Sequence, residues 1–244
     1  MRLVAAHTTY HRTMTEAARR YEEAEWRPNP DEVRVPEGRI HRRLSELIAA
    51  AATRALGATK EVDSSLNWYP NDGGTAMAPD VMVLPVGAAT LDPDEPDVGI
   101  RSYRQDLTNG PPPDAVVEIP SPGDPYVTVL TKMRRYQRLG AVSYVVLPYP
   151  GIPQATRLVP GDPVDHAWLG TPCPELGGIA FVVHEGRLAV RTHDGLIAPY
   201  DANLATVVEA ARHEAEQARQ EAEARVAALE ARLRDAGIDP ESVS

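Results

Sequence analysis

The sequence has a single cysteine, Cys173, among 244 residues. One cysteine excludes an internal disulfide and any zinc site built from several cysteines. The sequence also lacks a run of the roughly 18 apolar residues that a membrane-spanning helix needs. Its first residues contain no long apolar segment of the kind found in signal peptides. We therefore expect a cytoplasmic protein with no membrane partner.

Basic residues are scarcer than acidic ones, with 25 Lys and Arg against 35 Asp and Glu, for a net charge of -10. The chain from Asp201 onward holds 10 acidic and 5 basic residues, so half of this net charge lies there. Proteins that bind nucleic acid over a broad surface usually carry a basic face, because Lys and Arg neutralise phosphates. If this chain acts on DNA, it must do so through a local basic strip.

The composition that remains is that of a soluble globular protein, with 43% hydrophobic and 25% charged residues. From Asn203 to Ala236 the sequence predicts one long helix, because small and apolar residues recur in steps of three and four. We therefore expect a domain over residues 1–200 and a C-terminal helix within 201–244. The apolar seam of this helix is shallow and rich in alanine, which favours a weak coiled coil and a homodimer.

The chain before residue 114 predicts a helix, two strands and a loop. Residues 39–56 carry apolar side chains at the spacing of one buried helical face. Residues 60–70 and 78–86 read as two strands of a hairpin, and alternation in the second puts Asp80 at its entry. Residues 87–113 are rich in Pro, Asp and Gly, so we expect a loop with little regular structure.

A short apolar strand, a helix and a second apolar strand follow within residues 114–150. The first strand carries Glu118, and a buried carboxylate is costly unless a partner binds it. At about 100° per residue, Lys132 and Tyr136 share the inward face of the helix over 126–139. The same helix holds the most basic short segment of the chain, which supplies the local strip for DNA. Its other basic residues are Arg134, Arg135 and Arg138.

Asp80, Glu118 and Lys132 together suggest metal-assisted hydrolysis of a phosphodiester. Carboxylates from neighbouring strands are the oxygen ligands that Mg²⁺ or Mn²⁺ prefers, and the backbone carbonyl of Ile119 is a possible third ligand. Such an ion makes a bound water nucleophilic at neutral pH. A lysine beside it can orient or deprotonate that water and balance charge in the transition state.

These residues stand in motifs that resemble a known family. Four motifs carry the resemblance: Pro79-Asp80, VVEIPSPG over 116–123, Lys132 followed at steps of four by Tyr136 and Gly140, and YVVLP. Through them the chain resembles the Uma-two-type restriction endonucleases, a bacterial branch of the PD-(D/E)XK superfamily. His41 matches a histidine common at the head of a helix in that family. The resemblance implies a restriction-endonuclease-like α/β core, with a mixed central sheet flanked by helices and a long C-terminal helix. It also implies DNA cleavage dependent on a divalent metal.

Each of these residues also has a structural interpretation. Asp80 after a proline can cap a turn. Glu118 can form an ion pair with an arginine of the basic helix, and Lys132 can extend along the helix edge into solvent. His41 is more often a hydrogen bonder at a helix start than a ligand, and the arginines are as often a solvated face as a DNA track. The alternative function is therefore a catalytically silent nuclease fold that binds partners or oligomerises through its C-terminal helix.

Overall fold

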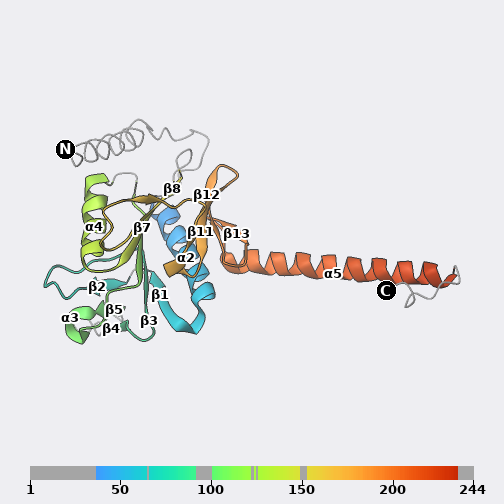
Figure 1. The fold of residues 1–244 in the computed structure, drawn as a ribbon, viewed down its shortest axis with the longest axis horizontal. Helices are drawn as coiled ribbons and strands as arrows, with labels where there is room; N and C mark the ends of the chain where they lie inside the picture. Colours follow the sequence, from blue (N-terminus) through green and yellow to red (C-terminus); the bar gives the residue numbers. More distant parts are fainter. Residues whose placement is uncertain are drawn as a thin grey trace.

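A mixed six-stranded sheet forms the centre of the computed structural model, which describes residues 37–64, 66–91, 101–121, 124, 126–148 and 153–235 (Figure 1). The strand order is β1-β3-β6-β7-β8-β9, and only β6 and β7 among these neighbours run parallel. The bounds are β1 (Lys60–Ser64), β3 (Val81–Pro85), β6 (Ala115–Glu118), β7 (Val142–Leu147), β8 (Gln154–Leu158) and β9 (His166–Ala167).

One face of this sheet packs against helix α2 (Glu37–Leu56) and a second, four-stranded antiparallel sheet. Figure 1 shows α2 between the two sheets. The buried residues of α2 follow the predicted helical spacing, with Leu44 and Ile48 fully buried. The turn between β11 and β12 has positive φ at Glu185 and Gly186, as a tight two-residue hairpin turn requires. The second sheet consists of β10 (Pro172–Cys173), β11 (Ile179–His184), β12 (Arg187–Arg191) and β13 (Ile197–Pro199).

The opposite face packs against helix α4 (Tyr126–Arg138) and a small three-stranded sheet. Met82 of β3 and Val116 of β6 point to this side, whereas Val81 and Val117 point to the side of α2. This alternation was predicted from the sequence, and it puts Glu118 on the side of α4, whereas the Asp80 carboxylate at the sheet edge contacts His41 of α2. The small sheet consists of β2 (Asn67–Tyr69), β5 (Arg101–Arg104) and β4 (Thr90–Leu91), in that order.

The prediction of an unstructured loop over residues 87–113 is wrong. This stretch contains β4, β5 and the short helix α3 (Gln105–Thr108), and Tyr103 is 2% exposed. The reason is a pairing over a long distance in sequence, because β5 lies parallel to β2 and covers Trp68. The expected hairpin is confirmed in part: β1 pairs with β3, but the chain after β1 leaves the main sheet to form β2.

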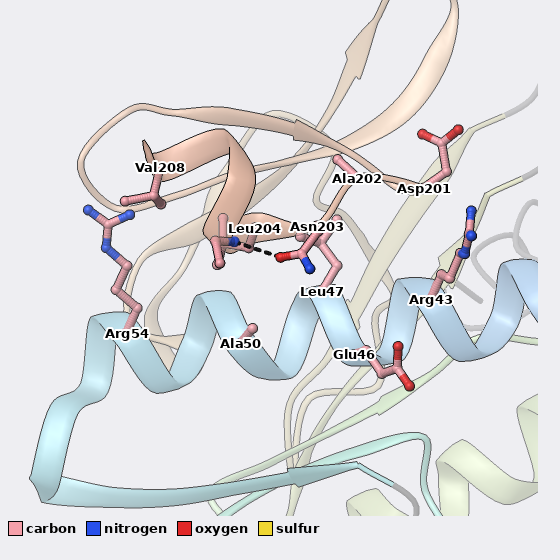
Figure 2. A pocket seen from close by; sticks show the side chains of 11 residues that line it. Arg43, Glu46, Leu47, Ala50, Arg54, Asp201, Ala202, Asn203, Leu204 and Val208 are labelled. Carbon is pink, nitrogen blue, oxygen red and sulfur yellow. Dashed lines mark hydrogen bonds between the residues drawn. The ribbon is translucent and has the colours of Figure 1, made fainter. Parts of the chain in front are cut away.

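Helix α5 (Leu204–Asp235) starts on the core and then extends away from the domain (Figure 1). Leu204 is buried, and Val208 packs against the core that surrounds α2. A cavity of about 610 Å³ lies between α2 and this first part of α5, and Figure 2 shows Arg43 and Arg54 at its margins. Asn203 begins the helix, because its Oδ1 accepts a hydrogen bond from the Ala205 N–H at 2.9 Å.

The architecture expected from the sequence is confirmed. A mixed central sheet is flanked by helices, and a long helix ends the described part of the chain. None of the described helices has the length and apolar character of a membrane span.

Candidate active site

Asp80 and Glu118 lie at one end of two adjacent strands. Asp80 immediately precedes β3, and Glu118 is the last residue of β6. The strands are antiparallel with Val81 opposite Val117, so the start of one meets the end of the other. The Asp80 N–H donates to the Val117 carbonyl at 3.0 Å, which extends the ladder to the carboxylate itself. The strand register therefore holds both carboxylates at the same edge.

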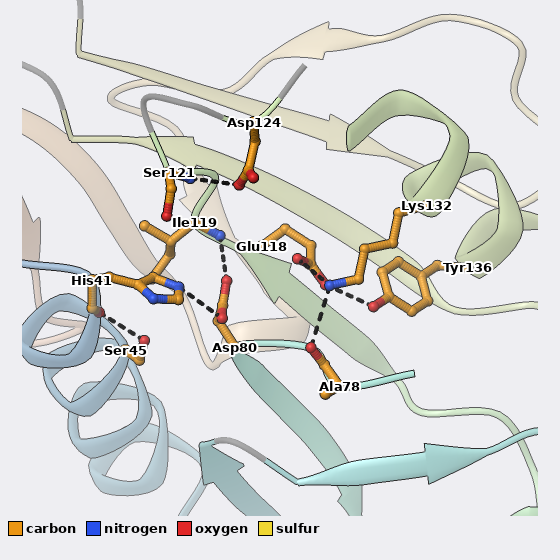
Figure 3. Close-up of polar contacts among 10 residues, drawn as sticks. All are labelled: His41, Ser45, Ala78, Asp80, Glu118, Ile119, Ser121, Asp124, Lys132 and Tyr136. Carbon is orange, nitrogen blue, oxygen red and sulfur yellow. Dashed lines mark hydrogen bonds and ion pairs between the residues drawn. The ribbon is translucent and has the colours of Figure 1, made fainter. Parts of the chain in front are cut away.

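Glu118 is 7% exposed, and both of its carboxylate oxygens are bonded to α4. Lys132 Nζ lies 2.7 Å from Oε2, and the Tyr136 hydroxyl donates to Oε1 at 2.6 Å (Figure 3). Burial raises the pKa of Glu118 to about 7; the Lys132 charge opposes this rise, and the Asp80 carboxylate adds to it. The partner that a buried Glu118 requires is therefore Lys132 together with Tyr136, and no arginine of α4 takes that place in the described structure.

Lys132 points toward the site and not along the helix surface. Its side chain is 36% exposed, and Nζ also donates to the backbone carbonyl of Ala78 at 3.3 Å. This second bond ties α4 to the segment that leads into Asp80. Lys132 thus bridges the two chain segments that carry the carboxylates (Figure 3).

Tyr136 is fully buried and fixes the position of Glu118. Its ring stacks on Trp68 with centroids 5.8 Å apart, and Trp68 Nε1 donates to Gln105 Oε1 at 2.9 Å. Sequence reasoning missed Trp68 and Gln105 as supports of the site, because the contact depends on the unexpected pairing of β2 with β5. Burial and the Glu118 carboxylate raise the pKa of Tyr136, so its hydroxyl stays protonated as a donor.

Removing the Tyr136 hydroxyl should raise the pKa of Glu118 further. In Tyr136→Phe the carboxylate loses a donor that favours its charged form, so we expect the pKa of Glu118 to rise above its value of about 7. The titration of the Glu118 side-chain carbon by NMR measures this value. Tyr103→Phe is a matched control, since it removes the hydroxyl of another buried tyrosine, which bonds to the Pro111 carbonyl. An unchanged Glu118 titration in Tyr136→Phe would contradict the assigned role.

Asp80 is held by the backbone of β6 and by α2. Its Oδ2 accepts a hydrogen bond from the Ile119 N–H at 2.6 Å, and its Oδ1 lies 2.8 Å from His41 Nε2. The histidine contact is short but not aligned as a hydrogen bond, so the buried Nε2 has no fully formed bond. The carboxylate contact outweighs burial and raises the pKa of His41. Within the described residues, the Asp80 carboxylate is therefore oriented from two sides, by the Ile119 N–H and by His41.

The matches with known proteins fit this arrangement. A family model described as "Putative restriction endonuclease" matches residues 15–166, more than half of the chain. The chain belongs to the Uma2 family. The resemblance stated from the sequence is thereby confirmed, and the matched range contains Asp80, Glu118 and Lys132 and ends before α5.

One similar solved structure is that of a putative nuclease belonging to DUF820 from Anabaena variabilis ATCC 29413. It is 12% identical, with a TM-score of 0.42, and the match covers 55% of this chain and 69% of that one. The comparison with curated proteins found no match. Membership of the Uma2 family supports a nuclease, which is a hydrolase.

Two of the three arginines expected to form the basic strip make ion pairs within the protein. Arg134 lies 3.6 Å from an Asp165 oxygen, and Arg135 lies 3.2 Å from an Asp72 oxygen. Arg138 is exposed, and no ion pair of Arg138 occurs among the residues that the structure describes. The bonded arginines tie α4 to the segments that carry Asp165 and Asp72, so their side chains are not simply a solvated face.

The oxygen donors of this Uma2 site suit Mg²⁺ or Mn²⁺. Within the described residues, no group of three His, Cys, Asp or Glu side chains is placed to hold a metal ion. Mg²⁺ is commonly bound by only one or two carboxylates, with water and substrate phosphate completing its shell. Asp80 and Glu118 match this requirement, and each carboxylate oxygen has a lone pair beyond the bond it already accepts.

Proposed function

We propose that this chain is an endonuclease that hydrolyses DNA phosphodiester bonds with Mg²⁺ or Mn²⁺ as cofactor. Asp80 and Glu118 would hold the metal, with the Ile119 carbonyl as a further ligand, and Lys132 would assist the attacking water. The observation that carries the proposal is the meeting of two carboxylates and a lysine from β3, β6 and α4 in one cluster.

The bound metal would polarise the phosphodiester and lower the pKa of a water molecule. Lys132 is placed to orient that water and to offset the negative charge that grows on the phosphoryl oxygens. The water would pass its proton to bulk solvent as its oxygen bonds to phosphorus, and the bond from phosphorus to the leaving oxygen would break. The leaving oxygen then takes up a proton. Tyr136 and the Ile119 N–H keep the two carboxylates in place through these steps.

DNA is the proposed partner, and α4 is the proposed contact to its backbone. Arg138 has no ion pair within the described part of the chain and would reach a phosphate, whereas Arg134 and Arg135 would contact DNA from positions fixed by Asp165 and Asp72. We also propose a cytoplasmic location, a nuclease domain over residues 1–200, and a homodimer formed through the helix of 201–244.

Incubation with supercoiled plasmid tests the proposed function. Wild type should nick the plasmid in Mg²⁺ or Mn²⁺ and not in a chelator, and Asp80→Ala and Lys132→Ala should each abolish nicking. Lys60→Ala and Asp114→Ala are matched controls, because this ion pair of 2.6 Å lies at the other end of β6. Failure of wild type to cleave, or cleavage unaffected by the site variants, would contradict the proposal.

The second candidate is a catalytically silent nuclease fold that serves as a binding or oligomerisation module. The observation that favours it is that both oxygens of the Glu118 carboxylate already have partners within the protein, Lys132 and Tyr136. Calorimetric titration with Mn²⁺ separates the two candidates. The nuclease should bind Mn²⁺ more tightly than its Glu118→Ala variant, whereas the silent fold should bind no more tightly than that variant.

A further inference from the structure

Helix α5 presents an uncovered apolar stripe along one side. At about 100° per residue, nine apolar or small residues spaced in steps of three and four fall within an arc of about 80°. Residues 212–229 are all exposed, and Val226 and Leu229 are 54% and 57% exposed. The stripe consists of Leu204, Val208, Ala211, Ala215, Ala218, Ala222, Val226, Leu229 and Leu233. Beyond its first turns, α5 therefore extends from the domain with a face suited to a partner helix (Figure 1).

The charged residues on the two sides of this stripe differ in whether they form ion pairs within the helix. On one side they pair within the helix: Arg219 bonds to Glu216 at 2.7 Å and approaches Glu223, and Arg234 lies 3.0 Å from Glu230. On the other side, no ion pair within the described residues involves Glu214, Glu221, Arg225 or Arg232. The acidic members of this second set come first along the helix, and the basic members come last.

These four charges are symmetric about residue 223. Glu221 and Arg225 lie two residues before and after it, and Glu214 and Arg232 lie nine residues before and after it. In an antiparallel pair of identical helices, residues on one side of the stripe lie next to residues on that same side of the second helix. A two-fold axis at residue 223 therefore sets Glu214 opposite Arg232 of the second copy, and Glu221 opposite Arg225 of the second copy.

The same axis matches large apolar side chains with small ones. It places Val226, Leu229 and Leu233 of one copy level with residues 220, 217 and 213 of the other. Those levels fall between the alanines of the stripe, which run from Ala211 to Ala222. The antiparallel pair therefore packs large side chains over small ones and fills the interface well. In a parallel pair, alanine would face alanine and leave the interface less filled.

We propose that α5 pairs with α5 of a second copy as an antiparallel helix dimer, with its two-fold axis near residue 223. Leu204 is 19 residues from this axis, so the first residues of the two helices lie about 57 Å apart at about 1.5 Å per residue. The two domains then stand at opposite ends of the helix pair. Each would engage its own segment of DNA, and the two sites would not act side by side on one short stretch.

Cysteine cross-linking measures the orientation of the helices. In the antiparallel dimer Leu229 lies level with residue 217 of the second copy, so Leu229→Cys should cross-link to Ala218→Cys when the two variants are mixed. Neither variant should cross-link to itself, because the like positions lie about 15 to 18 Å apart along the axis. Cys173 is buried and the unmodified protein should not react, which makes it the background control. Cross-linking of each variant to itself would show a parallel pair and overturn the proposal.

Charge exchange tests the same dimer without cysteine chemistry. Sedimentation of wild type should give about 53 kDa, twice the chain mass of 26.5 kDa. Glu214→Arg with Glu221→Arg should weaken association by about tenfold to a hundredfold, and adding Arg225→Glu with Arg232→Glu should restore it. Glu209→Arg reverses a charge away from the stripe and should have little effect. A wild-type mass of one chain, or failure of the fourfold variant to recover, would overturn the proposal, and neither outcome depends on nuclease activity.

Discussion

Replacing Lys132 by methionine should lower the rate of DNA cleavage about a thousandfold, equal to about 4 kcal/mol in the barrier. Methionine keeps much of the aliphatic length of the side chain but removes the ammonium that lies 2.7 Å from Glu118 and bonds to the Ala78 carbonyl. Both carboxylates remain, so Mn²⁺ binding at pH 8 should be retained. Single-turnover cleavage of a labelled duplex measures the rate, and calorimetry measures the metal affinity.

Loss of cleavage with retained metal binding is the result that separates Lys132 from the metal ligands. Asp80→Asn should lose both properties, because it removes a proposed ligand. Lys60→Met provides the matched control, since Lys60 forms its ion pair with Asp114 outside the site. Cleavage by Lys132→Met at a rate within threefold of wild type would show that the lysine has only a structural role.

The contribution of Glu118 to the stability of the metal-free protein should fall as the pH rises from about 4.5 to about 7. The folded state raises the pKa of Glu118 from 4.5 to about 7, so the folded protein binds more protons than the unfolded chain in this range. The stabilising contribution is therefore complete below the unfolded pKa and is lost as the pH passes the folded pKa. For this buried group the full contribution should amount to about 3 kcal/mol.

Glu118→Gln isolates this effect from other titrating groups. The raised pKa of His41 also makes stability fall with rising pH, so only the difference between wild type and variant reports Glu118. Urea unfolding at pH 5 and pH 8 in a chelator should show that wild type loses about 2 kcal/mol more than Glu118→Gln. Equal losses in the two proteins would mean that the Glu118 carboxyl is not held in a desolvated environment.

Much of the fold could be predicted because its signals are local in the sequence. The spacing of apolar residues predicted α2 and α4, and alternation in β3 correctly separated Val81 and Val83 from Met82. These patterns depend only on the period of a helix or strand and on which face is buried. They also brought Asp80, Glu118 and Lys132 to one cluster, since each lies at a position that its own element determines.

The small sheet escaped prediction because its contacts are distant in sequence. Residues 101–108 carry few apolar side chains, and their order comes from the parallel pairing of Trp68 with Tyr103. Buried polar bonds, such as that of Gln105 to Trp68, leave no periodic pattern. The support of Tyr136 by this sheet was therefore invisible in the sequence, although Tyr136 itself was placed on the correct face.

The surroundings of the carboxylates also depend on the folded structure. The contact of His41 with Asp80 joins α2 to the start of β3, and the bond from the Ile119 N–H sets the carboxylate plane. The pairing of Arg134 with Asp165 and of Arg135 with Asp72 is equally tertiary. Sequence composition identified a basic segment, but it did not reveal which of its charges are balanced within the protein.

A crystal structure with Mn²⁺, located by its anomalous scattering, tests the central claim most directly. We predict a manganese peak bonded to one oxygen of Asp80 and one of Glu118, with Lys132 Nζ still within reach of the site. The Glu118→Ala protein grown in the same conditions should show no peak there. A wild-type structure with manganese elsewhere, and with both carboxylates still bonded only to Lys132, Tyr136 and the Ile119 N–H, would contradict the claim.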